Sequence, residues 1–559
     1  MLLLFSVFLL LHFILFVPNF WVNRNYAQIL PVNEFKSKPK DFYKLIFKRW
    51  NPDFFRLNAE LMWILVIGLI FQSVFNSTLL FYGIIPVYLF SFSVLSYHYL
   101  ISGIFKRYPS WFNDWPQIKQ GFTIAKHGFI WHLLGGILLL IVLIFFLVVL
   151  CLFFVSLIEQ NNTMPLLVFC LVTLFVTHVY YWSLSFDPFR LIREFHIFRL
   201  EQFQVQYSVC YILANRLVSQ NLKTGLEALK QHSGSQSDEP VTWKKKPDLA
   251  FIAMESYGAI LYESKGFKND WENFVEVKDD EIKSLGYQVH SGFLLPPVSG
   301  GNSWLSFFGL VKGITIPSDA VYQVIFNDQK NYNFPSIFNQ LNLSNYATFW
   351  VSGIGGFKKM NIDWEAFKGF SGVQRILKYD DFKYNGPTFN IGPSAPDQFS
   401  LNKIMELVRE KAENKPSAFF FETINSHYKF GSPTQTLDHW QDCQTANRKD
   451  FKPITRSKKN VEENYLKAIK YQWDSVLDLL KNQQDNPYVY VIFGDHQPPM
   501  ITNPENSFKT PFHIITNVDL DKSYWDNLSF SSQLRLDLEE TPTIKNEDFL
   551  NYFNAYMNS

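Results

Sequence analysis

Four long segments without a charged residue occupy most of the first third of this chain. Residues 1–22, 61–103, 127–158 and 160–186 contain no Asp, Glu, Lys or Arg. The hydrocarbon core of a bilayer takes about 20 apolar residues of helix, and the second segment is long enough for two such helices. Soluble core helices rarely run this far without charge. The sequence therefore predicts five transmembrane helices within residues 1–187.

The next segment, residues 188–245, differs in composition from both of its neighbours. It first mixes apolar and polar residues at helical spacing, with Arg190, Arg193 and Arg199 close to the last apolar segment, and then becomes rich in Ser, Gly and Asp. The first part predicts a juxtamembrane helix that lies along the lipid headgroups. The second part is typical of a linker.

Residues 246–559 predict a soluble α/β domain. The stretches "PDLAFIAMES", "PSAFFFETINSH" and "NPYVYVIFGDH" each contain a continuous apolar run that is followed by polar residues. Such runs are typical of strands that are buried on both faces of a parallel sheet. Helical stretches separate the three runs, so we expect a mainly parallel sheet between two layers of helices.

Polar side chains follow each of these three runs. Glu255 ends the first, Asn425 and His427 follow the second, and Asp495 and His496 follow the third. Ligands of parallel sheets bind at the C-terminal ends of the strands, which share one edge. Carboxylate and imidazole groups at one edge suit a single divalent metal ion, with Mn²⁺ as the first candidate and Mg²⁺ or Zn²⁺ as alternatives. Taken singly, each residue has an ordinary structural interpretation.

A serine in a glycine-rich turn supplies a candidate nucleophile. The stretch "SGGNSWLSFFGLVKG" places Ser303 between a turn and an apolar run with helical character. At a helix N-terminus the backbone N–H groups and the helix dipole favour an anion, and a nearby cation would activate the hydroxyl. The alternative is that Ser303 only caps the helix.

In this order and spacing, the motifs resemble the alkaline phosphatase/sulfatase superfamily. The most similar branch is membrane-anchored and contains lipoteichoic acid synthases and phosphoglycerol transferases, with lipid A phosphoethanolamine transferases more distant. The resemblance implies that the nucleophile also ligates the metal. The implied ligands are Glu255, Ser303, Asp495 and His496, and the implied substrate-binding residues are Asn425 and His427.

Two departures from the family patterns limit what is carried over. Arylsulfatases have a Cys-x-Pro-Ser-Arg motif that is followed several residues later by a Gly. When Gly313 is placed on that Gly, Ser303 takes the position of the nucleophile, and Leu305 and Phe307 take the positions of the Pro and the Arg. This disfavours a sulfatase mechanism. Lipoteichoic acid synthases also carry a Trp-Asn-Arg motif, for which the nearest stretch supplies only Lys358 and Lys359 as candidate substrate-binding cations.

The resemblance implies transfer of a phosphoglycerol-type group through a phospho-Ser303 intermediate. The donor would be a phosphatidylglycerol-like membrane lipid, and the acceptor a glycan or polymer of the cell envelope. A membrane sulfatase or phosphodiesterase, a phosphoethanolamine transferase and a catalytically inactive binding module remain the alternatives. The sequence argues against nucleic acid as a partner, because no basic stripe is paired with stacking aromatic residues.

The loop charges and the resemblance predict opposite orientations. Residues 23–60 and 104–126 hold the basic residues between the apolar segments. The positive-inside rule places these loops, and with five spans also the catalytic domain, in the cytoplasm. The family resemblance implies a multi-pass protein of the cell membrane whose catalytic domain is extracytoplasmic, and we give it more weight than a moderate loop charge.

Overall fold

The computed structural model of the chain forms two compact units, Met1–Asn221 and Leu222–Ser559. Each unit has its own cluster of buried apolar side chains. The residues that the structure describes are 1–22, 56–75, 78–105, 109–112, 114–115, 118, 130–183, 204–206, 208–232, 239–355, 362–390, 394–454, 460–499, 501–502 and 507–559.

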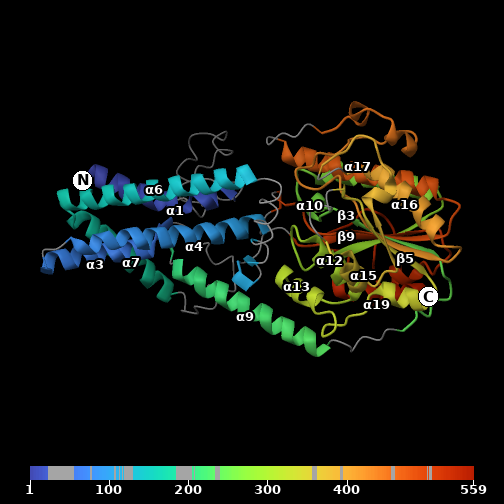
Figure 1. Cartoon of the computed structure of the whole chain (residues 1–559), viewed down its shortest axis with the longest axis horizontal. Helices are drawn as coiled ribbons and strands as arrows, with labels where there is room; N and C mark the ends of the chain where they lie inside the picture. Colours follow the sequence, from blue (N-terminus) through green and yellow to red (C-terminus); the bar gives the residue numbers. More distant parts are fainter. Residues whose placement is uncertain are drawn as a thin grey trace. The chain divides into compact units, whose positions relative to one another are not determined.

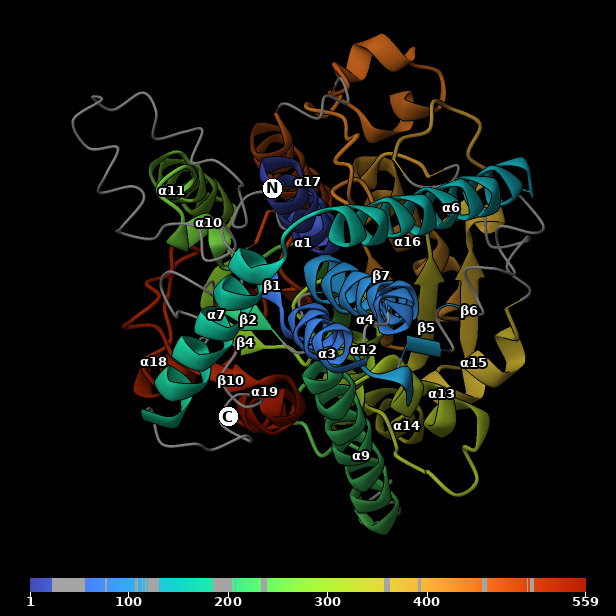
Figure 2. The same ribbon diagram turned by 90° about the vertical axis from the view of Figure 1, so that its left-hand side faces the viewer.

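Apolar helices make up most of the first unit. They are α1 (Leu2–Val22), α3 (Ala59–Phe75), α4 (Ile84–Phe105), α6 (Ile130–Gln160) and α7 (Met164–Ser183). Helix α4 packs against α1, α3 and α6, and α3 packs against α7, so that the helices lie alongside one another (Figures 1 and 2). Each predicted apolar segment therefore contributes at least one helix to a shared core.

Two segments of the described chain are long and apolar enough to cross a bilayer, Leu79–Ile101 and Leu134–Gln160. Three shorter apolar helices accompany them, Leu2–Pro18, Ala59–Phe75 and Met164–Phe175. Leu139 of α6 is 70% exposed, and contact with lipid would remove such surface from water. Insertion of all five segments stays a prediction.

The predicted juxtamembrane segment is described only in part. Its C-terminal portion contains the helix α9 (Ser208–His232), which is preceded by the short strand β2 (Gln204–Gln206). Strand β2 pairs in parallel with β1 (Arg56–Asn58). Residues 184–203, with the three arginines, lie outside the described residues.

An eight-stranded, mainly parallel sheet organises the second unit, as the sequence predicts. The strand order is β10-β4-β9-β8-β3-β7-β5-β6, and only β9 runs antiparallel to its neighbours β4 and β8. The strands are β3 (Asp248–Met254), β4 (Gln288–Leu295), β5 (Ala347–Ser352), β6 (Arg375–Lys378), β7 (Ser417–Glu422), β8 (Tyr488–Gly494), β9 (Thr510–Thr516) and β10 (Thr543–Lys545).

Helices cover both faces of this sheet (Figure 1). One face carries α10 (Ile260–Glu263), α11 (Lys268–Ser284), α16 (Asp397–Lys411) and α17 (Val461–Asn482). The other face carries α12 (Ser303–Lys312), α13 (Asp319–Asn327), α14 (Ile337–Leu343), α15 (Trp364–Ser371), α18 (Ser523–Asn527) and α19 (Phe549–Asn558). The side chains of β3 point alternately to the two helix layers. Ala250 and Ile252 belong to the apolar cluster on the side of α11, α16 and α17. Phe251 packs on the other side, against Phe338 of α14 and Phe553 of α19.

The strand order places three functional segments side by side. Strand β3 lies between β8 and β7, with Met254 opposite Gly494 and Ala253 opposite Glu422. All three strands are parallel, so their C-terminal ends meet at one edge of the sheet. The residues that follow β3, β7 and β8 are therefore neighbours in space.

Gly494, the last residue of β8, allows the chain to approach the turn after β3. A Cβ atom at this position would lie 1.8 Å from the carbonyl oxygen of Tyr257. We expect Gly494→Ala to destabilise the second unit by about 3 kcal/mol or more, because the backbone must shift. Thermal unfolding of the purified full chain tests this, with Gly225→Ala as control because its Cβ has open space. An unchanged unfolding midpoint for Gly494→Ala would contradict it.

Candidate active site

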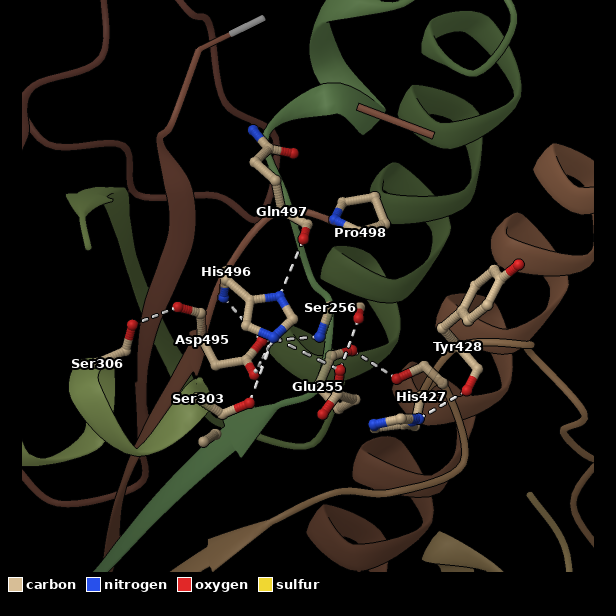
Figure 3. Close-up of polar contacts among 12 residues, drawn as sticks. Glu255, Ser256, Ser303, Ser306, His427, Tyr428, Asp495, His496, Gln497 and Pro498 are labelled. Atoms are coloured by element: carbon tan, nitrogen blue, oxygen red, sulfur yellow. Dashed lines mark hydrogen bonds and ion pairs between the residues drawn. The ribbon is translucent and has the colours of Figure 1, made fainter. Parts of the chain in front are cut away.

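Glu255, Asp495 and His496 converge at the C-terminal edge of the sheet. Nε2 of His496 lies 3.2 Å from Oδ2 of Asp495 and 3.8 Å from Oε1 of Glu255. One potential ligand atom from each residue lies within 4.8 Å of the others, and all three side chains are buried. Figure 3 shows this group around the imidazole of His496. The parallel pairing of β3 with β8 brings these distant residues together.

The donor atoms of this group fit a divalent cation. Oδ1 of Asp495 accepts the backbone N–H groups of Ser256 and His496, each at 2.7 Å, whereas Oδ2 is buried without a hydrogen-bond donor. Nδ1 of His496 lies 2.9 Å from the carbonyl oxygen of Gln497. Donation from Nδ1 leaves the lone pair of Nε2 free for a metal. A buried carboxylate oxygen without a hydrogen-bond donor, next to an imidazole nitrogen, is a common pair of metal ligands.

Burial and mutual repulsion perturb the protonation of these groups. Burial raises the pKa of Asp495 to about 6. Burial acts to lower the pKa of His496, but the carboxylates of Asp495 and Glu255 raise it above its ordinary value. The site therefore concentrates negative charge and attracts a positive partner, which is a proton on His496 or a metal ion.

Ser303 lies next to the group formed by Glu255, Asp495 and His496, and it comes from α12, which covers one face of the sheet. It is the first residue of α12, and its Oγ lies 3.3 Å from Nε2 of His496. The N-cap position is occupied by Asn302, which has a left-handed backbone with φ of 57°, so Ser303 is not the cap. The hydroxyl of Ser306 donates to the carbonyl oxygen of Asp495 at 2.6 Å and ties α12 to the end of β8. The hydroxyl of Ser303 thus lies against His496, which is one of the three converging residues.

The loop after β7 places His427 and Asn425 differently. His427 is partly exposed, with Nδ1 2.7 Å from the carbonyl oxygen of Tyr428, and it lies on the far side of Glu255 from Ser303 in the view of Figure 3. Asn425 is fully buried. Its side-chain oxygen accepts the N–H of Asp397 and its amide nitrogen donates to the carbonyl oxygen of Ala395. Both ends of the Asn425 amide are therefore used inside the protein, which disagrees with the predicted contact to substrate.

The two predicted lysines cannot be placed. Lys358 and Lys359 fall within residues 356–361, which lie outside the described residues. Their contact with substrate stays a prediction.

Glu422 is a third carboxylate at this edge, and the sequence analysis missed it. It is the last residue of β7 and lies opposite Ala253 of β3. Burial raises the pKa of Glu422 well above its usual range, the carboxylates of Glu255 and Asp495 raise it further, and Ser303 acts in the opposite direction. The signal was available, because "AFFFE" ends an apolar strand in a carboxylate as "AFIAME" does.

Comparison with known proteins gives one family match. Residues 259–528 match the family model described as Sulfatase. No protein among those with curated functions matches the sequence significantly.

Several solved structures are similar in part. The integral membrane lipooligosaccharide phosphoethanolamine transferase EptA of Neisseria meningitidis has 12% identity and a TM-score of 0.45, covering 90% of this chain and 96% of its own. The phosphoglycerol transferase GacH of Streptococcus pyogenes has 13% identity and a TM-score of 0.37, covering 62% and 81%. The lipoteichoic acid synthase LtaP of Listeria monocytogenes has 17% identity and a TM-score of 0.35, covering 52% and 70%.

The raised pKa of Asp495 predicts the pH dependence of metal binding. A metal ligand must be ionised, and Asp495 takes up a proton near pH 6, where an ordinary aspartate is still charged. We expect the affinity for Mn²⁺ to begin to fall as His496, whose pKa is raised, takes up a proton, and to fall more steeply below pH 6, where Asp495 is protonated as well, as measured by calorimetry between pH 7.5 and 5. Asp495→Asn should lose the binding, and Asp248→Asn, at the other end of β3, should keep it. An affinity that is constant down to pH 5 would contradict the assignment.

Proposed function

We propose that this chain, whose residues 259–528 match the Sulfatase family model, is a metal-dependent phosphotransferase. It would move a phosphoglycerol-type headgroup from a membrane lipid to a glycan or polymer of the cell envelope. One observation carries the proposal: Oγ of Ser303 lies 3.3 Å from Nε2 of His496, at the point where Glu255 and Asp495 also converge. A nucleophile and a metal-binding group share one site.

In the first step, Oγ of Ser303 would attack the phosphorus of a phosphatidylglycerol-like donor. The Oγ–P bond forms, and the bond between phosphorus and the diacylglycerol oxygen breaks. The proton of Ser303 ends on the released diacylglycerol. The phosphoglycerol group is then held as an ester of Ser303, which makes the donor half of the reaction independent of the acceptor.

In the second step, a hydroxyl group of the acceptor would attack the same phosphorus. The new P–O bond forms as the Oγ–P bond breaks, and the acceptor's proton restores the Ser303 hydroxyl. His427, which is partly exposed in the loop after β7, would hold the phosphate during both steps. The chain thereby returns to its starting state.

Glu255, Ser303, Asp495 and His496 would hold one divalent cation, with Mn²⁺ as the first candidate. When bound, the cation supplies positive charge that stabilises the negative charge developing on the phosphoryl oxygens. The protein's own contribution is to fix the ligands. Hydrogen bonds from the backbone to Asp495 and from His496 to Gln497 keep two of them oriented before substrate arrives.

An unmodified serine fits this site better than a sulfatase's modified residue. Leu305 and Phe307 stand where arylsulfatases have Pro and Arg, and both are buried, with the ring of Phe307 5.0 Å from that of Phe420. These side chains belong to the core of the α12 layer. Hydrolysis of a phosphodiester or a sulfate ester, and transfer of phosphoethanolamine, remain alternatives that differ in the group carried or in the acceptor.

The nucleophile can be tested by trapping the covalent group. Incubation of the full chain with phosphatidylglycerol labelled in its headgroup should add phosphoglycerol to a peptide that contains Ser303, seen by mass spectrometry. Ser303→Ala should abolish both the adduct and the release of diacylglycerol, because it removes the hydroxyl that lies 3.3 Å from Nε2 of His496. Ser299→Ala, in the same loop, is the matched control and should retain both.

The acceptor requirement separates the candidate activities. A transferase should release the label onto added glycan or polymer, whereas a hydrolase should release free glycerol phosphate without any acceptor. Cleavage of an aryl sulfate, with no adduct from phosphatidylglycerol, would contradict the proposed function.

The orientation of the catalytic domain has its own test. The proposed donors and acceptors meet outside the cytoplasm, so the domain must be extracytoplasmic. Five spans with both basic loops in the cytoplasm would place it in the cytoplasm instead. The proposal therefore requires either a different number of spans or the opposite orientation of the loops. A reporter that is active only outside the cytoplasm, fused after residue 240, should be active. Activity of a cytoplasmic reporter at the same position would exclude the proposed substrates.

A further inference from the structure

The loop that carries His427 is attached directly to the backbone of Glu255. Thr423 donates its N–H to the carbonyl oxygen of Ala253 at 2.9 Å, and its Oγ1 accepts the N–H of Glu255 at 3.1 Å. The hydroxyl of Ser426 donates to the carbonyl oxygen of Glu255. A displacement of residues 423–427 would therefore also disturb a proposed metal ligand.

A buried carboxylate holds the same loop from the other side. Asp397 is the first residue of α16 and is fully buried. Its Oδ1 accepts the N–H of Ile424 at 3.0 Å and its Oδ2 accepts the N–H of Asn425 at 2.9 Å. The N–H of Asp397 donates in return to Oδ1 of Asn425 at 2.8 Å. Both oxygens of one carboxylate thus bind consecutive peptide groups of the loop.

Asn390 completes the attachment through the carbonyl groups. Its amide nitrogen donates to the carbonyl oxygens of Ile424 and Asn425, at 3.3 and 3.0 Å, and also to that of His427. Asn390 itself has a left-handed backbone with φ of 58°. The N–H groups and the carbonyl groups of the loop are therefore fixed by different side chains, and few conformations of the loop satisfy both.

We propose that Asp397 is a positioning residue, whose carboxylate fixes residues 423–427 so that His427 is held ready for the substrate phosphate. This inference rests on the proposed function. Asp397 does not touch the substrate, because it is fully buried, and it acts through His427. An ionised carboxylate is suited to this task, since bonds between a charged acceptor and backbone N–H groups are stronger than neutral ones.

Asp397→Asn keeps the shape of the side chain but turns one acceptor into a donor that faces a backbone N–H. We expect kcat/KM for headgroup release from phosphatidylglycerol vesicles to fall about tenfold, mainly through KM, because the loop no longer holds His427 in place. The affinity for Mn²⁺ should stay within about threefold of that of the unmodified chain, since Asp397 binds Ile424 and Asn425, while the contacts of Thr423 and Ser426 with the backbone of Glu255 do not involve it. The full chain in detergent is used throughout.

A double-mutant cycle separates positioning from general destabilisation. If Asp397 acts through His427, the variant with both Asp397→Asn and His427→Ala should be no worse than His427→Ala alone. The matched control is Asp248→Asn, which removes a carboxylate that accepts the N–H and hydroxyl of Ser417 at the far end of β7. It should leave kcat/KM within about twofold.

Two outcomes would overturn the inference: full activity of Asp397→Asn, or losses that multiply in the double variant as independent effects do. Should Asp397→Asn fail to fold, Asn390→Gly tests the same attachment of the loop. Glycine tolerates the left-handed backbone at this position, and the substitution removes the amide that donates to the loop. Its effect on kcat/KM must also vanish when His427 is already replaced by Ala. Failure of the unmodified chain to release any headgroup would refute the proposed function itself, and the inference with it.

Discussion

The parallel pairing of β3 with β8 and β7 determines the chemistry of this domain. Because the three strands run in the same direction, their C-terminal ends lie together, and the chain places a carboxylate at each end: Glu255, Glu422 and Asp495. Burial raises the pKa of both Glu422 and Asp495, and the charges of neighbouring carboxylates raise both pKa values further. His496 is the one basic side chain among the described residues of this group, so the site has an affinity for positive charge built into its fold.

The remaining layers of the domain hold groups against that edge. Ser306 fastens α12 to the end of β8 and so sets the position of Ser303. Asp397 and Asn390 fasten the loop after β7 from the side of α16. These contacts use backbone atoms of Asp495, Ile424, Asn425 and His427, and not the side chains of Ser303, His496 and His427. Rigid attachment of this kind is what phosphoryl transfer requires, since its catalysis consists mainly of positioning and charge stabilisation.

The sequence was informative where a local rule applies. Apolar runs that end in polar residues predicted the parallel sheet. Because the C-terminal ends of parallel strands lie at one edge, the same runs also predicted that Glu255, Asp495 and His496 are neighbours. The same rule would have found Glu422. The sequence analysis assigned Asn425 to substrate binding. Nothing in the neighbouring sequence reveals that the side-chain oxygen of Asn425 accepts the backbone N–H of Asp397, 28 residues away. Hydrogen bonds between segments distant in sequence cannot be read from composition or spacing. The apolar segments predicted helices, while only two of them have the length and composition of membrane spans in the described chain.

The central claim is that side chains from separate strands and a helix bind one metal ion beside the nucleophile. The most direct test is anomalous diffraction from crystals grown with Mn²⁺, recorded on both sides of the manganese absorption edge. The account predicts a single strong anomalous peak in contact with Oδ2 of Asp495, Nε2 of His496, a carboxylate oxygen of Glu255 and Oγ of Ser303. A peak elsewhere in the catalytic domain, with these four groups bonded only to protein or water, would contradict it.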